Sequence, residues 1–199
     1  MSSSALPDWA RAQVGAHRRA ADAFEESVLA EVLDVAAVLQ AAFEGGGFLY
    51  TFGNGGSAAD AQHFTGELIG HYKRDRRPLP AVTLTTDATV VSCVANDYGY
   101  DDVFSRQVQA LARPGDVVAG FSTSGRSPSI CAGLKAAQEA GATTVLFGGE
   151  SAGPAGEYAD HQLLAPASAT ARIQEMHTLM LHLISEFLDA WAAREEPSA

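Results

Sequence analysis

The sequence has few cysteines, few basic residues and no long apolar run. Its two cysteines, Cys93 and Cys131, are far apart in the chain, which argues against a disulfide framework and against a CxxC metal site. Lysine and arginine number 13 against 24 aspartates and glutamates, so the formal net charge is -11. A chain this acidic has no general attraction for nucleic acid or for an anionic membrane surface. An anionic ligand would have to be held by backbone dipoles and a few side chains.

The absence of a long apolar run indicates where the protein is located, and its length and composition indicate how many domains it has. No stretch is long enough to span a bilayer, and the N-terminus lacks the apolar segment of a signal peptide. We therefore expect a cytoplasmic protein with no membrane partner. The length of 199 residues and a hydrophobic share of 47% predict a single globular domain, with tails in the first few residues and in 195–199.

Apolar periodicity predicts the secondary structure. Apolar residues three and four apart indicate a long helix over about 9–44, and a run of glycines beginning at Gly45 ends it. Short apolar runs then alternate with helical stretches across an α/β core over 48–193. The runs cover 48–52, 81–84, 117–121, 143–147 and 161–164, and the last helix covers about 171–193.

This alternation favours an α/β fold with a parallel sheet covered by helices on both faces. The N-terminal helix exceeds what one sheet face needs, so its apolar stripe packs either on a neighbouring subunit or on its own domain.

Two glycine- and hydroxyl-rich loops follow predicted strands. Residues 53–57 read Gly-Asn-Gly-Gly-Ser, and residues 122–127 read Ser-Thr-Ser-Gly-Arg-Ser. Ligands in open α/β sheets bind at the C-terminal ends of the strands. Glycines let the backbone approach a ligand, hydroxyls donate hydrogen bonds, and a following helix adds free N–H groups. Each loop alone could simply cap a helix, but the pair indicates a site for a phosphorylated small molecule.

A possible acid–base pair lies on two separate helices. His63 and Glu67 are four residues apart and share one helix face, while Gln174 and His182 share one side of the last helix. A carboxylate and an imidazole are the groups that aldose–ketose isomerisation needs. The same four residues offer ligands suited to Zn²⁺. The alternatives are a structural His63–Glu67 pair and a core position for His182 among its apolar neighbours.

The motifs that carry these residues resemble the phosphoheptose isomerases, which are sedoheptulose 7-phosphate isomerases of the SIS (sugar isomerase) fold. The similar segments are 53–67, 95–97, 121–127 and 172–177, and the resemblance extends over nearly the whole chain. It implies one SIS domain over 1–199 with a three-layer, flavodoxin-like fold and a five-stranded parallel sheet. It also implies a homotetramer with active sites at subunit interfaces.

The resemblance further implies an activity and a role for each matched residue. Sedoheptulose 7-phosphate and D-glycero-D-manno/altro-heptose 7-phosphate would interconvert through an enediol, with Glu67 as the base and His182 as the acid. Some members of the family bind zinc through positions that match His63, Glu67, Gln174 and His182, which implies one Zn²⁺ per subunit. The implied substrate contacts are Asn54, Gly55, Gly56, Ser57, Asp97 and Gln174 for the sugar, and Ser122, Thr123, Ser124 and Ser127 for the phosphate.

One departure and two alternatives accompany this interpretation. Many family members have an aspartate where this chain has Ala171, which leaves the identity of the sugar open. Some close relatives are non-catalytic tetramers that bind the bacterial replication initiator, but they lack the catalytic Glu and His that Glu67 and His182 provide here. A sugar-phosphate-binding regulatory domain is disfavoured because the chain has no basic patch and no length for a DNA-binding module.

Overall fold

The computed structural model describes residues 7–194, so the expected tail at 195–199 lies outside the described residues. The strands are β1 (Leu49–Gly53), β2 (Ala81–Thr83), β3 (Val117–Ser122), β4 (Thr143–Gly148) and β5 (His161–Leu164). The helices are α1 (Asp8–Ser27), α2 (Leu29–Glu44), α3 (Gly56–Ile69), α4 (Ala88–Asp97), α5 (Ser105–Leu111), α6 (Pro128–Glu139) and α7 (Thr170–Ala192), with 3-10 helices η1 (Tyr100–Asp102) and η2 (Gly153–Tyr158). Within residues 7–194, no helix has both the length and the apolar character that crossing a bilayer requires.

The strands form one parallel five-stranded sheet in the order β2-β1-β3-β4-β5. This is the strand order of flavodoxin-like folds, and it confirms the predicted fold class. The central strands β1 and β3 are buried along their whole length. Strands buried on both faces are expected where helices cover both sides of a parallel sheet.

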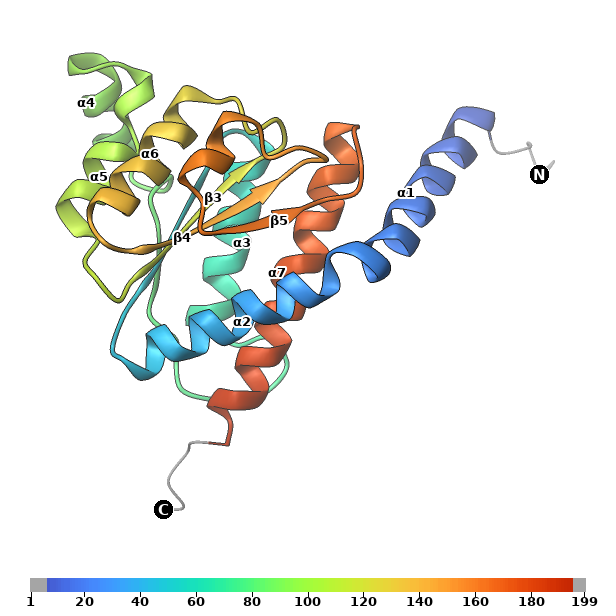
Figure 1. Ribbon diagram of the computed structural model, residues 1–199, viewed down its shortest axis with the longest axis horizontal. Helices are drawn as coiled ribbons and strands as arrows, with labels where there is room; N and C mark the ends of the chain where they lie inside the picture. Colours follow the sequence, from blue (N-terminus) through green and yellow to red (C-terminus); the bar gives the residue numbers. More distant parts are fainter. Residues whose placement is uncertain (1–6, 195–199) are drawn as a thin grey trace, which may run out of the picture.

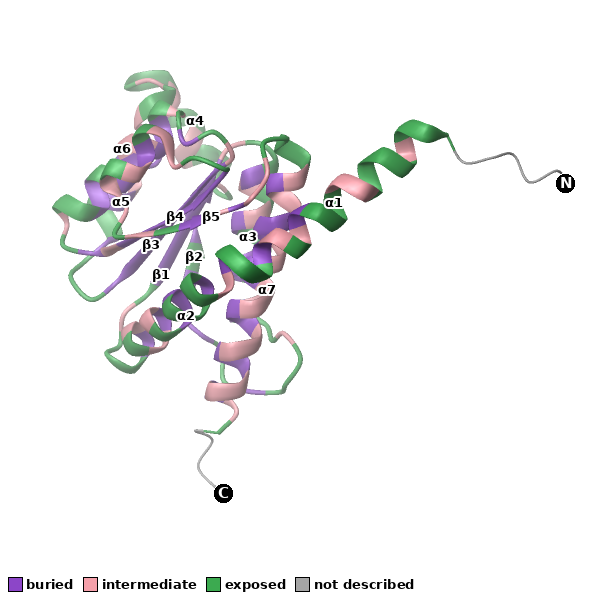
Figure 2. Cartoon of the chain, turned by 45° about the vertical axis from the view of Figure 1, so that its right-hand side comes forward, coloured by how far each residue is buried: buried purple, intermediate pink, exposed green. Residues whose placement is uncertain are grey.

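Helices cover the sheet in two layers (Figure 1, Figure 2). On one face α2, α3 and α7 pack over a core that includes the stacked rings of Phe121 and Phe147, whose centroids are 4.1 Å apart. On the other face α4, α5 and α6 pack over Phe52 and Phe104, with centroids 4.8 Å apart. Successive strand residues point to opposite faces, so the three central strands β1, β3 and β4 supply both cores.

The N-terminal helix expected over 9–44 is divided at Val28 into α1 and α2. Val28 has φ -129° and ψ -21°, and the Ser27 hydroxyl donates to the Ala23 carbonyl at 2.7 Å. A serine that bonds back to the carbonyl four residues earlier often bends a helix. Beyond the bend, the first turns of α1 extend away from the body of the molecule (Figure 1). Trp9, at the start of α1, is 71% exposed.

The loop between α3 and β2 is held by a buried charge, Asp189 of α7. Its carboxylate accepts hydrogen bonds from the backbone N–H groups of Tyr72, Lys73 and Arg74. It also accepts one from Arg76 Nε at 2.9 Å, and both side chains of this pair are fully buried. Burial would raise the pKa of Asp189, but these N–H groups and the Arg76 charge outweigh it and lower the pKa.

The Arg76 guanidinium in turn donates to backbone carbonyls at the end of α3, including those of Glu67 and Leu68, each at 2.8 Å. The last carbonyls of a helix have no partner within it. Arg76 therefore ends α3, and through Asp189 it ties that end to α7.

We expect Asp189→Ala to lower the free energy of unfolding by about 3–5 kcal/mol, because it leaves the Arg76 guanidinium buried and unpaired. Urea titration followed by circular dichroism measures this. Glu186→Ala is the matched control, since it removes a carboxylate one turn away that pairs with the exposed side chains of Lys73 and Arg74. If the two variants unfold at the same urea concentration, the buried Asp189–Arg76 pair does not hold this loop.

Candidate active site

The two glycine- and hydroxyl-rich loops lie side by side at the centre of the sheet. They follow β1 and β3, which are neighbours, and the chain continues from β1 to β2 on one side and from β3 to β4 on the other. Such a reversal of strand order opens a crevice at the C-terminal ends of the strands, where open α/β sheets bind their ligands. The sequence prediction that both loops contribute to one site is consistent with this placement.

Asn54 joins the two loops. Its Nδ2 donates to the hydroxyls of Ser127 at 2.9 Å and Ser129 at 3.0 Å, and these hydroxyls are 3.1 Å from each other. Gly55, at the start of α3, has φ +56°, which glycine adopts without strain. Neither α3 nor α6 has a side chain that caps its N-terminus. The helices behind both loops therefore start without a side-chain acceptor, which suits an anionic ligand.

The second loop is folded around Gly125. Its backbone N–H donates to the buried Ser122 hydroxyl at 3.1 Å, and the Arg126 N–H donates to Ser124 Oγ at 3.2 Å. Gly125 has φ +61°, and a Cβ there would lie 1.9 Å from the Ala152 carbonyl oxygen. Thr123 is half-buried and Ser124 is exposed at the turn. The loop needs glycine because the segment before η2 packs directly against it.

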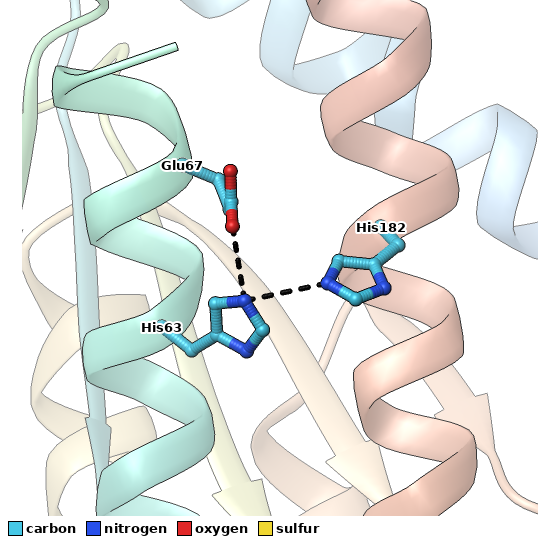
Figure 3. A group of neighbouring side chains, drawn as sticks. All are labelled: His63, Glu67 and His182. Carbon is cyan, nitrogen blue, oxygen red and sulfur yellow. Dashed lines mark hydrogen bonds and ion pairs between the residues drawn. The ribbon is translucent and has the colours of Figure 1, made fainter. Parts of the chain in front are cut away.

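A cluster of three side chains lies between α3 and α7 (Figure 3). His63 Nε2 is 3.0 Å from Glu67 Oε1 and 3.3 Å from His182 Nε2. The His63–Glu67 pair of α3 therefore contacts His182, which comes from the last helix, α7. His182 is partly exposed, so it is not the core histidine that the sequence left as an alternative.

The surroundings of His182 favour its neutral form. Burial, together with the electrostatic influence of His63 and Lys73, lowers the pKa of His182, while the Glu67 carboxylate opposes the shift. The ring of Tyr72 stacks on the His182 ring, with centroids 5.4 Å apart. Sequence reasoning missed Tyr72, because nothing in its local pattern relates the α3–β2 loop to α7.

The three side chains suit a metal ion. One ligand atom from each of His63, Glu67 and His182 lies within 4.8 Å of the others. Two imidazole nitrogens and a carboxylate oxygen are the donor set of a catalytic zinc site with an open position. Gln174, the fourth expected ligand, has its amide against Gly56 at the start of α3, where a Cβ would lie 2.3 Å from Nε2.

The other expected sugar contacts are placed as follows. Ser57 is buried in the first turn of α3, next to Gly56. Asp97 is exposed at the C-terminal end of α4, where it accepts hydrogen bonds from Asn96 Nδ2 at 2.7 Å and Cys93 Sγ at 3.6 Å. Among the hydrogen bonds of residues 7–194, none joins Asp97 to either loop.

The buried histidine of α7 is His177, not His182. Its Nε2–H donates to the Gly148 carbonyl at 2.8 Å, at the end of β4. Burial lowers the pKa of His177 to about 4 despite this hydrogen bond, so the ring is neutral at pH 7. Its Nδ1 is 3.9 Å from the Asp60 carboxylate, whose pKa is raised by burial to about 6. His177 thus anchors α7 to the sheet behind the cluster.

Comparison with known proteins agrees with this geometry. The model of the SIS domain family matches residues 14–149. The chain belongs to the SIS domain family. Its relatives include the phosphoheptose isomerase of Aquifex aeolicus, 44% identical over 84% of this chain and 87% of the relative, and the probable phosphoheptose isomerase of Thermoplasma acidophilum, 47% identical over 80% and 87%.

A solved structure extends the similarity to the fold. The phosphoheptose isomerase from Neisseria gonorrhoeae superimposes with a TM-score of 0.87 at 36% identity, over 92% of this chain and 98% of that one. Within the SIS domain family, the chain therefore groups with the phosphoheptose isomerases, which are sugar-phosphate isomerases. The family prediction made from the four motifs is confirmed.

We expect Gly125→Ala to destabilise the SIS fold far more than Gly46→Ala, although both glycines have positive φ. The backbone conformation alone costs about 1–2 kcal/mol for alanine, and it applies to both variants. In addition, the Cβ of an alanine at position 125 would lie 1.9 Å from a backbone carbonyl oxygen, whereas no atom lies within 4 Å of a Cβ at Gly46. Urea titration measures the difference, and equal losses of stability would contradict the packing described for this loop.

Proposed function

We propose that this protein interconverts sedoheptulose 7-phosphate and D-glycero-D-manno/altro-heptose 7-phosphate. The observation that carries the proposal is that Glu67 and His182, from two separate helices, lie in one cluster, and that α3, which holds Glu67, begins at the first of the two loops suited to a phosphate. The relatives named phosphoheptose isomerase support the choice of a seven-carbon sugar phosphate. The same observation favours an enzyme over a non-catalytic adaptor for the replication initiator, which would have no use for this pair.

In the proposed reaction Glu67 removes a proton from C1 of the ketose and returns it to C2, which passes through an enediol. His182 moves protons on the two neighbouring oxygens, and a neutral imidazole can both donate and accept them. His63 lies within hydrogen-bond distance of both groups and orients them. The hydroxyls of Ser122, Thr123, Ser124 and Ser127 hold the phosphate, and Asn54, Ser57, Asp97 and Gln174 contact the sugar.

We also propose one zinc ion per subunit, held by His63, Glu67 and His182, with Gln174 as a further ligand. When bound, zinc would supply Lewis-acid polarisation of the substrate carbonyl. A glutamate that binds a metal is a weaker base. Since Oε1 of Glu67 faces His63, its second oxygen is left for proton transfer.

The proposed assembly is a homotetramer in the cytoplasm with active sites at subunit interfaces. It is supported by the exposed apolar residues of α1, where Trp9 is 71% and Val14 is 53% exposed. A helix that extends from the domain with such residues gains stability when a second copy covers them.

With sedoheptulose 7-phosphate as substrate, we expect the wild type to form aldose phosphate, and both Glu67→Gln and His182→Ala to lower kcat by roughly 100-fold or more, as for a lost general base or acid. Aldose formation is followed by chromatography. Glu139→Gln, an exposed change at the end of α6, is the control.

Two outcomes would contradict this proposal. If the wild type leaves sedoheptulose 7-phosphate unchanged but converts another ketose phosphate, the substrate is wrong, and Ala171 is the first position to examine. If Glu67→Gln keeps full activity, the assigned base is wrong.

For the metal, we expect elemental analysis to find about one zinc per subunit in the purified protein and markedly less in His63→Ala, because the donor set loses a nitrogen. His161→Ala, a histidine change on β5, is the matched control and keeps its zinc. A metal-free protein whose activity withstands chelators would refute the zinc site.

A further inference from the structure

A tyrosine outside the expected motifs contacts the first glycine-rich loop. Tyr100 begins η1, after α4, and its phenol hydroxyl donates to Asn54 Oδ1 at 2.8 Å. Gly99 precedes it with φ +105°, a conformation that glycine adopts readily and that turns the chain toward the first loop. The Tyr100 side chain is otherwise open to solvent, since the residue is 53% exposed. Within residues 7–194, the one hydrogen bond described for this side chain is the bond to Asn54.

This contact selects one of two orientations of the Asn54 amide. A primary amide has an acceptor oxygen and a donor nitrogen of nearly the same shape, so its orientation follows from its partners. A phenol donates more strongly than it accepts, because its oxygen lone pair is conjugated with the ring. Tyr100 therefore holds Oδ1 on its own side and leaves Nδ2 to face Ser127 and Ser129.

The orientation of Asn54 decides what the serines can do. With Nδ2 as donor, the Ser127 and Ser129 hydroxyl oxygens act as acceptors. One hydroxyl proton can lie between the two oxygens, which are 3.1 Å apart, and the other is left for a ligand. If the amide turned over, its oxygen would face the serines and take their protons. Ser127 directly precedes α6 and does not cap it, so its hydroxyl is committed to this network.

We propose that Tyr100 is a positioning residue, which fixes the Asn54 amide so that a serine hydroxyl proton of the second loop is presented to the phosphate group of the substrate. The proposal rests on the phosphate-binding part of the proposed function, but it does not depend on which sugar carries the phosphate. Tyr100 acts through Asn54 and takes no part in proton transfer at the sugar.

The test is calorimetric binding of inorganic phosphate to the full-length protein. We expect Tyr100→Phe, which removes only the hydroxyl, to weaken binding about three- to tenfold, the effect of one net hydrogen bond. The thermal midpoint should stay close to that of the wild type. Tyr98→Phe is the matched control, because Tyr98 is a neighbouring exposed tyrosine whose described contact is the stacking of Arg106 on its ring.

A double-mutant cycle separates action through Asn54 from a direct contact with phosphate. In an Asn54→Ala background, Tyr100→Phe should cause no further loss of phosphate affinity. Asn54→Leu, which keeps the size of the side chain, is the second background if the alanine variant unfolds. With a substrate that turns over, Tyr100→Phe should raise KM by a similar factor and change kcat less.

Three results would overturn the inference. Tyr100→Phe could bind phosphate as tightly as the wild type. The loss could persist undiminished without Asn54, which would make Tyr100 a direct ligand. The wild type could fail to bind phosphate at all. If the wild type binds phosphate and shows the coupling but leaves sedoheptulose 7-phosphate unchanged, the inference stands and only the proposed substrate fails.

Discussion

The site depends on the packing of α3 against α7. The two helices meet at three levels, with Gly56 against Gln174 at the start of α3 and His63 against His182 further along. Beyond the end of α3, Arg76 bonds Asp189. Gly56 permits the first contact, because a side chain there would displace the Gln174 amide. The buried charge pair secures the last contact. Between them, the Glu67 carboxylate and the His63 and His182 imidazoles are brought together, although His63 and His182 are 119 positions apart in the chain.

The second constraint is the reversal of strand order between β1 and β3. Both strands end at the same edge of the sheet, and their chains leave in opposite directions. The loops that follow can therefore lie together without steric competition from a crossover. Asn54 and Ser127 join them by a hydrogen bond. The two loops proposed to bind the phosphate are thus brought together by the sheet topology, while the proposed acid–base cluster is brought together by helix packing, and α3 belongs to both.

The buried and the exposed histidines of α7 show how burial assigns roles. His177 points to the sheet, loses its proton affinity and bonds the Gly148 carbonyl. His182 is just over one turn further along, faces α3 and remains partly exposed. Both lie in an apolar helix, so their sequence context is nearly the same. What distinguishes them is the face of the helix that each occupies, and that depends on which side of α7 meets the sheet.

Several features followed from the residues alone, because their causes are local. The strand runs, the glycine loops at 53–57 and 122–127, and the pairing of His63 with Glu67 are set by periodicity and by neighbours in the chain. The same local patterns did not reveal the bend at Val28, where the Ser27 hydroxyl bonds back to the Ala23 carbonyl.

The motif resemblance supplied the family and the candidate roles. No periodicity relates residues more than 100 positions apart, so the contact of His63 with His182 and the stacking of Tyr72 on His182 required the folded chain. Those contacts exist because burying the apolar faces of α3 and α7 leaves one arrangement of the two helices, and the polar side chains along their shared edge then meet.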